Sequence, residues 1–213
     1  MKIRLGYACI STTLDITTSG TITYTNFLKE KNYNKINNLI TSNLTNLKEL
    51  LIYNIKNNIH FFRMSSNLIP LATKDDVCFD YIKPYKENYD KISKIINDNN
   101  LRVDFHLPEF CVLNSTSKET VVNSIKIIEY HYNLLEAMNI KNKILVLHIG
   151  SSVLGKKNSI TRFINNFNKL PSYLKEIIVI ENDDKIFSIE DCLEINKKTN
   201  IPIVLDYHHY MCN

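Results

Sequence analysis

Histidines and carboxylates follow several apolar segments of this sequence, at points where parallel strands are expected to end. Six such residues stand out by type and position: His106, His148, Glu181, Asp206, His208 and His209. Imidazole and carboxylate groups that converge from separate strands suit a cluster of divalent metal ions, because each ion needs several donors and a carboxylate can bridge two ions. The sequence therefore predicts a metal centre, with Glu181 as the natural bridging ligand.

Each of these residues also has a structural interpretation. One histidine after a strand is more often a hydrogen-bonded structural residue than a ligand, but four such histidines together favour metal binding. Glu181, in the segment ENDDK, is alternatively a loop or helix-capping carboxylate, although its place after the apolar run IIVI favours a function. Asp206 and His209 are three residues apart, so they are expected to face different sides and to bind two neighbouring ions, with His208 as a competitor. The other two histidines are predicted to be structural: His60 and His131.

Short β-branched runs alternate with longer segments of helical period. The strand candidates are residues 3–9, 60–64, 101–107, 143–150, 176–182 and 201–209. Three sets of apolar residues recur at helical spacing: Leu44, Leu47 and Leu51; Ile92, Ile95 and Ile96; Val122, Ile125 and Ile128. Thr116 with Glu119 has the form of a capping box that starts the third helix. Strands that alternate with helices predict repeated βα units and a parallel sheet, whose polar strand ends share one edge.

Length and composition restrict the class of protein. The 213 residues are expected to form a single domain over residues 1–213, and 44% hydrophobic with 23% charged residues is ordinary for a globular protein. The five cysteines form no CxxC pair, which favours reduced thiols in an intracellular protein. The amino-terminal segment lacks the pattern of a secretory signal, and no run approaches the roughly 20 apolar residues of a membrane span. The net charge of +4 permits a polyanionic partner without requiring one.

The chain resembles the UV-damage endonucleases over residues 1–213. Six segments carry the resemblance in the family's order: LGYACIS, FRMSSNLIPLAT, FHLPEFCVLNS, VLHIGSSVLGKK, VIENDDK and VLDYHHY. The resemblance implies an α/β fold of the TIM (β/α)8-barrel type, related to endonuclease IV. Because a closed barrel of this type takes about 250 residues, we expect about six βα units here and the last two to be missing. The open edges that this would leave predict self-association.

The resemblance also implies an activity and a ligand set. Family members use two or three divalent ions, often Mn²⁺, to hydrolyse the phosphodiester 5′ to UV photoproducts and some other lesions in double-stranded DNA. By this resemblance His106 and His148 bind one ion, Glu181 bridges, Asp206 holds the second ion and His209 the third. The catalytic set would then be His106, His148, Glu181 and Asp206.

Residues implied to contact DNA lie on other segments. Family members probe the damaged bases with a residue pair that corresponds to Glu109 and Phe110, although Glu109 departs from the usual neutral amide. Tyr7 corresponds to an aromatic residue near the lesion, and barrel-mouth packing is the alternative for it. The segment after residue 62 contains the expected phosphate-facing residues: Arg63, Ser65, Ser66 and Asn67. Lys74 stands where the family often has a histidine, and it is read as a solvated loop charge or a phosphate contact.

Two other functions fit the same residues. A metal-dependent sugar isomerase can share this barrel and its histidine and carboxylate ligands, because a fold does not determine a reaction. The segment SSN and the loop with Glu109 and Phe110 argue against the isomerase. A non-catalytic remnant that binds damaged DNA is the second alternative, because an ion deprived of ligands binds more weakly.

Overall fold

Six short parallel strands alternate with helices in the computed structural model, which describes residues 3–213. Two compact units divide the chain. Unit 1 contains the described residues up to Phe105 together with Asn133–Lys143, and unit 2 contains His106–Tyr132 and Ile144–Asn213. The predicted βα repeat is confirmed, whereas the assignment of one domain to residues 1–213 stays a prediction.

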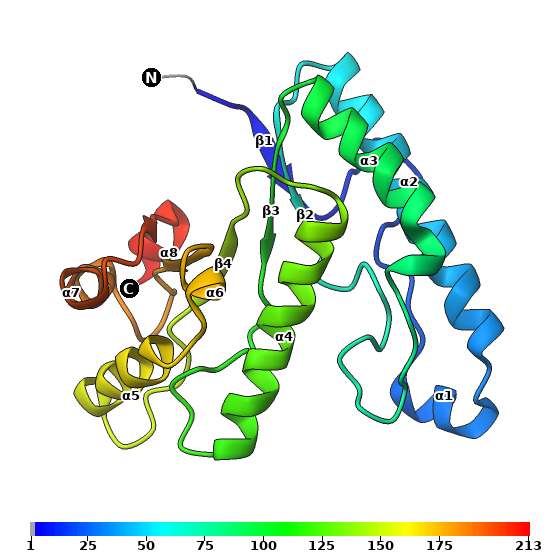
Figure 1. Ribbon diagram of the computed structural model, residues 1–213. Helices are drawn as coiled ribbons and strands as arrows, with labels where there is room; N and C mark the ends of the chain where they lie inside the picture. Colours follow the sequence, from blue (N-terminus) through cyan, green and yellow to red (C-terminus); the bar gives the residue numbers. More distant parts are fainter. Residues whose placement is uncertain (1–2) are drawn as a thin grey trace. The chain divides into compact units, whose positions relative to one another are not determined.

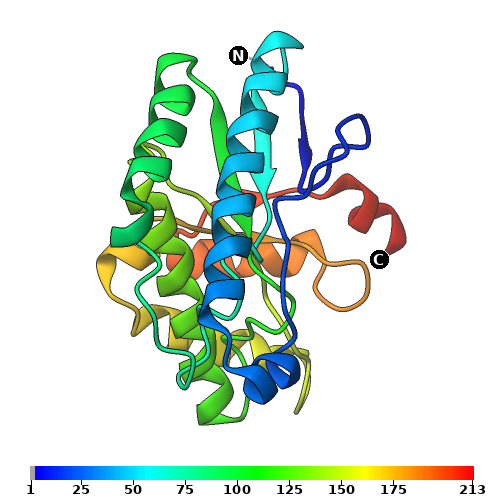
Figure 2. The ribbon, with the colours of Figure 1, turned by 90° about the vertical axis from the view of Figure 1, so that its right-hand side faces the viewer.

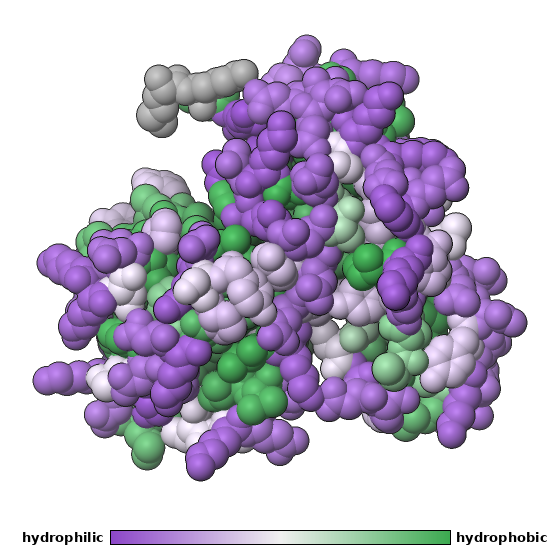
Figure 3. Space-filling model, in the orientation of Figure 1, coloured by the Kyte–Doolittle hydropathy of each residue, from purple (hydrophilic) through white to green (hydrophobic). Residues whose placement is uncertain are grey.

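Unit 1 carries the first three strands, which pair in parallel in their order along the chain. Its elements are β1 (Gly6–Ala8), α1 (Tyr24–Glu30), α2 (Tyr33–Lys56), β2 (Phe61–Met64), the 3-10 helix η1 (Lys83–Tyr85), α3 (Lys86–Asp98) and β3 (Arg102–His106), whose last residue begins unit 2. The helices α2 and α3 run side by side (Figures 1 and 2). Hydrophilic side chains cover much of the visible surface over these two helices (Figure 3).

The long helix α2 forms because its apolar residues recur on one face. Ile36, Ile40, Leu44, Leu47 and Leu51 are all buried, at spacings of three or four residues. Asn32 caps the start of the helix, since its side chain accepts a hydrogen bond from the backbone N–H of Lys35. The predicted face with Leu44, Leu47 and Leu51 is therefore confirmed.

Unit 2 carries the other three strands, again parallel and in chain order. Its elements are β4 (Leu145–His148), α5 (Lys156–Asn168), α6 (Ser172–Lys175), β5 (Ile178–Glu181), α7 (Ile189–Thr199), β6 (Ile203–Val204) and α8 (Tyr207–Cys212). Helix α4 (Lys118–Ala137) begins in unit 2 and ends in unit 1. All four residues of β5 are buried, which explains why its first three residues are apolar and leaves Glu181 as a buried carboxylate at the strand end.

Two local predictions are wrong. The sequence pattern predicts an extended segment over 201–209, but β6 ends at Val204 and α8 begins at Tyr207, because the Asp206 side chain accepts the backbone N–H of His209 as a helix cap. The pattern also predicts that Thr116 caps the start of α4, but the capping oxygen belongs to Ser117, which accepts the backbone N–H of Thr120. Among residues 3–213, no helix combines the length and hydropathy needed to cross a membrane.

Candidate metal centre

Strand register brings the first two ligand candidates together in unit 2. His148, the last residue of β4, is the register partner of Glu181, the last residue of β5. Register partners on neighbouring strands project side by side from the same face of a sheet. The His148 Nε2 atom lies 4.0 Å from the Glu181 Oε1 atom, and the Glu181 side chain is only 3% exposed. The buried carboxylate therefore faces the edge at which the strands end.

His106 approaches the same carboxylate oxygen from the end of β3. Its Nε2 atom lies 3.6 Å from Glu181 Oε1, and its Nδ1 atom lies 2.8 Å from the backbone oxygen of Leu107. A carbonyl oxygen only accepts, so Nδ1 carries a proton and Nε2 of the neutral ring keeps a lone pair toward Glu181. Metal-binding histidines are usually oriented by this kind of second hydrogen bond. The backbone N–H of Leu107 donates to Val146, which holds the chain next to His106 in place.

The environment of His148 favours a neutral imidazole. Burial lowers the pKa of His148, and the neighbouring His106 and His209 lower it further, while Glu181 acts in the opposite direction. The Nε2 atom of His148 faces Glu181, so the neutral ring can offer its lone pair to a cation beside that carboxylate.

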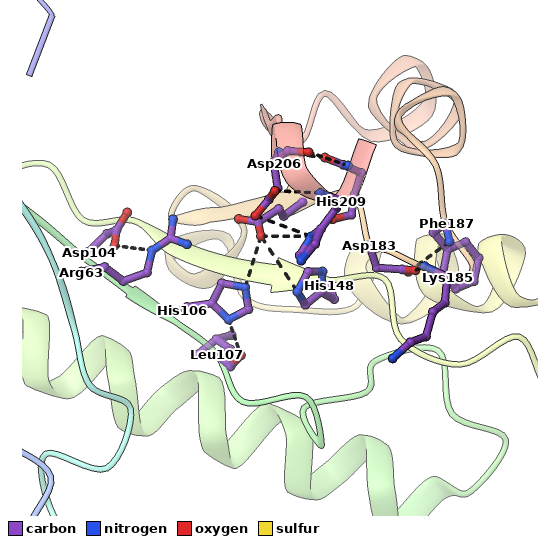
Figure 4. A network of polar contacts seen from close by, with 12 residues as sticks. Arg63, Asp104, His106, Leu107, His148, Asp183, Lys185, Phe187, Asp206 and His209 are labelled. Carbon is purple, nitrogen blue, oxygen red and sulfur yellow. Dashed lines mark hydrogen bonds and ion pairs between the residues drawn. The ribbon is translucent and has the colours of Figure 1, made fainter. Parts of the chain in front are cut away.

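A second group forms around Glu181, Asp206 and His209. His209 Nδ1 lies 3.9 Å from Glu181 Oε1 and 3.7 Å from Asp206 Oδ2. The expectation that Asp206 and His209 face different sides is wrong, because Asp206 caps α8 and its carboxylate accepts the backbone N–H of His209, which brings the two side chains together. The adjacent His208 is exposed and belongs to neither group. Figure 4 shows His106, His148 and His209 converging.

Hydrogen bonds keep the Asp206 carboxylate charged and orient the His209 ring, and both effects favour the binding of a cation. Burial alone raises the pKa of Asp206, but backbone hydrogen bonds from His209 and His208 and the nearby imidazoles outweigh it and lower the pKa. The His209 Nδ1 atom lies 2.9 Å from the backbone oxygen of Asn182, to which it must donate, so its lone pair is on Nε2. Asp206 is therefore an anion at neutral pH, next to an oriented imidazole.

The donor set fits divalent metal ions. His106, His148 and Glu181 form one group and Glu181, Asp206 and His209 the other, and within each group the potential ligand atoms lie within 4.8 Å of one another. Imidazole nitrogen with carboxylate oxygen suits Mn²⁺, Zn²⁺ and Fe²⁺. Because Glu181 is common to both groups, one carboxylate can serve two neighbouring ions, as the sequence suggested.

The residues predicted to face phosphates lie in unit 1. Arg63 is the register partner of Asp104, and its Nε atom lies 3.1 Å from Asp104 Oδ1. The carboxylate is buried, so this ion pair holds the guanidinium in place (Figure 4). Ser65 is buried and its hydroxyl accepts the backbone N–H of Asn67, which leaves Ser66 and Asn67 as the more accessible residues of this turn.

The two aromatic residues predicted to contact DNA differ in exposure. The Tyr7 hydroxyl donates to Asn54 Oδ1 over 2.8 Å, and its ring packs edge-on against Phe62 at 5.2 Å. Phe110 is 68% exposed, and the neighbouring Glu109 is exposed as well. The loop that carries Phe110 is nevertheless fixed, because the backbone N–H of Cys111 donates to Pro108. Packing in unit 1 therefore accounts for Tyr7, and packing does not account for Phe110.

The remaining candidates have structural partners. The Lys74 ammonium lies 5.3 Å from the centre of the Tyr24 ring, as a cation over an aromatic face. The His60 backbone N–H donates to Leu5, and His131 is buried in α4 with Nδ1 bonded to Ile127. Sequence reasoning missed Asp104 and Asn182. The signal for Asn182 was its place next to Glu181, whereas the partnership of Asp104 with Arg63 depends on strand register.

Comparison with known proteins gives the family and the fold. The model of the family described as UV-endonuclease UvdE matches residues 3–213. A UV DNA damage endonuclease from Bacillus cereus (strain B4264) is 37% identical over 218 residues, which cover 100% of this chain and 69% of that protein. The crystal structure of SacUVDE is 37% identical with a TM-score of 0.93, and the match covers 100% of this chain and 72% of that one.

A more distant likeness concerns the fold alone. Endonuclease IV from Thermus thermophilus matches with a TM-score of 0.56 at 11% identity, over 98% of this chain and 64% of that chain. The predicted α/β class of the TIM-barrel type is thereby confirmed, with six βα units present in the chain. The family model and the 37% identical relative, and not this distant likeness, favour the endonuclease over the sugar isomerase as the class of enzyme. The chain belongs to the UV-endonuclease UvdE family of DNA-repair endonucleases.

Proposed function

We propose that this chain hydrolyses the phosphodiester 5′ to UV photoproducts and related lesions in double-stranded DNA, using divalent ions bound around Glu181. The observation that carries the proposal is the position of Glu181 Oε1, which lies within 4.0 Å of nitrogen atoms from three histidines. A buried carboxylate surrounded by imidazoles is an arrangement that metal ions stabilise. A purely structural role for these residues would not explain why three imidazoles gather around one buried carboxylate.

Each ligand has a proposed part. His106 and His148 bind one ion, Asp206 and His209 bind a second, and Glu181 bridges the two, in keeping with the two residue groups. The family resemblance places a third ion at His209. In this structure His209 already belongs to the group of Glu181 and Asp206, so a third ion would share His209 with the second ion. Mn²⁺ is the proposed metal, because it accepts both imidazole and carboxylate ligands. When bound, such ions polarise the phosphoryl oxygen and lower the pKa of water.

The protein side chains contribute position and charge. His106 and His209 are held by hydrogen bonds from Nδ1 to backbone oxygens, so each presents Nε2 without reorganisation. The low pKa of His148 keeps that ring neutral and able to bind an ion, and the low pKa of Asp206 keeps its carboxylate charged. We assign catalytic roles to His106, His148, Glu181 and Asp206 on these grounds.

Phe110 is the proposed probe of the lesion. Its ring is exposed on a fixed loop that begins directly after the ligand His106, and an exposed ring can stack on a base or enter an unstacked step. A damaged step unstacks at lower cost than an intact one, which gives selectivity. Glu109 would lie near phosphates and weaken binding, and Tyr7, Arg63, Ser65, Ser66 and Asn67 are proposed as further DNA contacts.

A duplex with one UV photoproduct, labelled at one 5′ end, tests the proposal. The purified chain with Mn²⁺ is expected to produce one labelled fragment that ends in a 3′-hydroxyl on the 5′ side of the lesion. Glu181→Gln is the control, because it keeps the shape of the side chain but removes its charge. Wild-type nicking no greater than that of Glu181→Gln would exclude the proposed activity. Lesion-dependent binding without cleavage would instead support the alternative of a DNA-binding remnant.

A further inference from the structure

Three buried asparagines share one hydrogen-bonding pattern, in which the side-chain amide binds both the N–H and the C=O of a single residue. Asn43 binds Gly20 at 2.8 and 2.9 Å, Asn114 binds Ser151 at 2.9 and 2.7 Å, and Asn182 binds Asp206 at 2.9 and 3.0 Å. All three side chains are at most 1% exposed. In each case the asparagine provides the donor and the acceptor that a neighbouring strand would otherwise supply.

The amide of Asn182 acts where strand pairing ends. The last register pair between β5 and β6 joins Glu181 to Val204. Asn182 follows directly, and its side chain then binds the backbone of Asp206, two residues beyond Val204. A buried amide with both bonds made fixes the residue that it binds, because breaking either bond leaves a buried polar group unsatisfied. The backbone of Asp206 is thus fixed at the point where the chain turns into α8.

The same residue also reaches the other two ligands of that group. Its backbone oxygen accepts the Nδ1 proton of His209, and Glu181 precedes it in the chain. We propose that Asn182 is a positioning residue that sets the geometry of the Glu181, Asp206 and His209 group. This inference rests on the proposed function, because it assumes that the group binds an ion. The other two asparagines bind Gly20 and Ser151, which belong to neither group of potential ligands.

The consequence for metal binding is specific. Removal of the Asn182 side chain leaves its backbone oxygen in place, so His209 keeps its hydrogen bond while Asp206 loses two. Changes in residues that orient metal ligands typically weaken metal binding by about 10- to 100-fold. We therefore expect Asn182→Ala to weaken the binding of the ion held by Asp206 and His209, with little effect on the binding of an ion by His106 and His148.

Amide exchange of the metal-free chain tests the positioning by itself. The Asp206 backbone N–H is expected to exchange slowly in the wild-type chain and at least about ten times faster in Asn182→Ala, because the acceptor is removed. The matched control is Asn43→Ala, which removes the same two bonds to Gly20 and a third to Leu68 in unit 1. Unchanged exchange at Asp206 in Asn182→Ala, or an equal increase in Asn43→Ala, would overturn the inference.

Titration with Mn²⁺ alone, followed by the electron paramagnetic resonance signal of the free ion, tests the effect on metal. Asn182→Ala is expected to weaken one class of site by about 10- to 100-fold, and Asn43→Ala to leave Mn²⁺ binding unchanged although it is destabilising. In an Asp206→Ala background, Asn182→Ala is expected to cause no further loss, because it acts through Asp206. The inference would be contradicted if Asn182→Ala still weakened Mn²⁺ binding by about 10- to 100-fold in the Asp206→Ala background. Equal weakening of Mn²⁺ binding by Asn43→Ala would also contradict it.

The two experiments separate this inference from the proposed function. A wild-type chain that binds no Mn²⁺ would contradict the proposed metal chemistry, whereas the exchange of the Asp206 amide would still decide whether Asn182 fixes Asp206. Normal Mn²⁺ binding by Asn182→Ala would overturn the positioning of the metal group while leaving the proposed function intact.

Discussion

The Oε1 atom of Glu181 lies 3.6 Å from the Nε2 atom of His106, and the same oxygen faces the second group of potential ligands. Because both groups need this carboxylate, we predict that Glu181→Gln removes Mn²⁺ binding at both, whereas Asp206→Asn removes it at one. Equilibrium dialysis against Mn²⁺ measures the number of ions bound. The expected order is wild type above Asp206→Asn, and Asp206→Asn above Glu181→Gln.

A control for that comparison comes from the same segment. Asp184 is half-buried, its Oδ2 atom lies 3.6 Å from Lys185 Nζ, and it belongs to neither ligand group. Asp184→Asn is therefore expected to bind as many ions as the wild type. Equal stoichiometry in Glu181→Gln and Asp206→Asn would contradict the shared role of Glu181.

Phe110 is predicted to serve DNA recognition and not metal binding. Loss of one stacked aromatic ring costs about 1–3 kcal/mol, so Phe110→Ala is expected to bind a damaged duplex roughly 5- to 150-fold more weakly. Its Mn²⁺ binding and unfolding midpoint should not change, because the ring is 68% exposed. Fluorescence anisotropy with damaged and intact duplexes provides the measurement. Tyr173→Ala, which alters an exposed aromatic residue elsewhere in unit 2, serves as the control, and equal weakening by both variants would argue against the role of Phe110.

The ion pair of Arg63 and Asp104 is predicted to be important for stability as well as for the position of the guanidinium. Arg63→Met leaves a buried carboxylate without this cation, which is expected to cost about 3–5 kcal/mol in the free energy of unfolding. Urea denaturation measures this loss, and the double variant Arg63→Met with Asp104→Leu should recover most of it.

The exposed pair of Lys86 and Asp90 gives the comparison for this ion pair. Because water screens both of its groups, Lys86→Met is expected to change the unfolding free energy by less than about 1 kcal/mol. Similar losses for the two single variants would show that burial of Asp104 does not determine the effect.

The sequence predicted the type of fold well, because apolar strand runs and helical spacing reflect local rules. The sequence was less informative about which face of a helix is buried and about the residues at which helices and strands end. In α4 the spacing suggested Val122 as a core position, but Val122 is exposed and Ser124 is buried instead. Ser124 tolerates burial because its hydroxyl donates to the Thr120 carbonyl one turn earlier and accepts the backbone N–H of Val112 in the preceding loop. The spacing of apolar residues carries no sign of these two bonds.

The ligand candidates were predictable because chemistry placed at strand ends converges in parallel sheets. The sequence could not show which of those candidates lie next to each other. Strand register places His148 beside Glu181, and a helix cap places Asp206 and His209 in one group. Asn182 was overlooked for the same reason. Its two bonds to Asp206 join residues 24 positions apart, and only the fold brings them together.

Four of the five cysteines are predicted to fall into two classes of reactivity toward alkylating reagents. Burial raises the pKa of Cys111 and of Cys192 to about 12 in each case, so neither thiol forms the reactive thiolate at pH 8. Cys78 and Cys212 are exposed, and iodoacetamide is expected to modify them first. Mass spectrometry of the native chain gives the order of modification, and early labelling of Cys192 would contradict the buried position.

The same shifts have a consequence for stability. The folded chain keeps these two protons up to about pH 12, whereas the unfolded chain releases them near pH 8.5, so the unfolded state binds fewer protons between these values. The contribution of both thiols to the unfolding free energy is therefore complete below about pH 8.5 and is lost as the pH rises toward 12. Replacement of both by Ala should flatten the pH dependence of the urea midpoint in this range, and an unchanged slope would count against it.

Self-association is predicted from the last strand. Among residues 3–213, β6 pairs with β5 alone, and the following Leu205 is 54% exposed. A strand with one unpaired edge next to an exposed apolar side chain can pair with another chain. Sedimentation velocity over a range of concentrations is expected to show reversible association that Leu205→Lys weakens, because a charge on an edge opposes pairing. Leu193→Lys places the same charge on the exposed surface of α7 and should leave association unchanged, so equal effects of the two charges, or a monomer at every concentration, would exclude β6 as the contact.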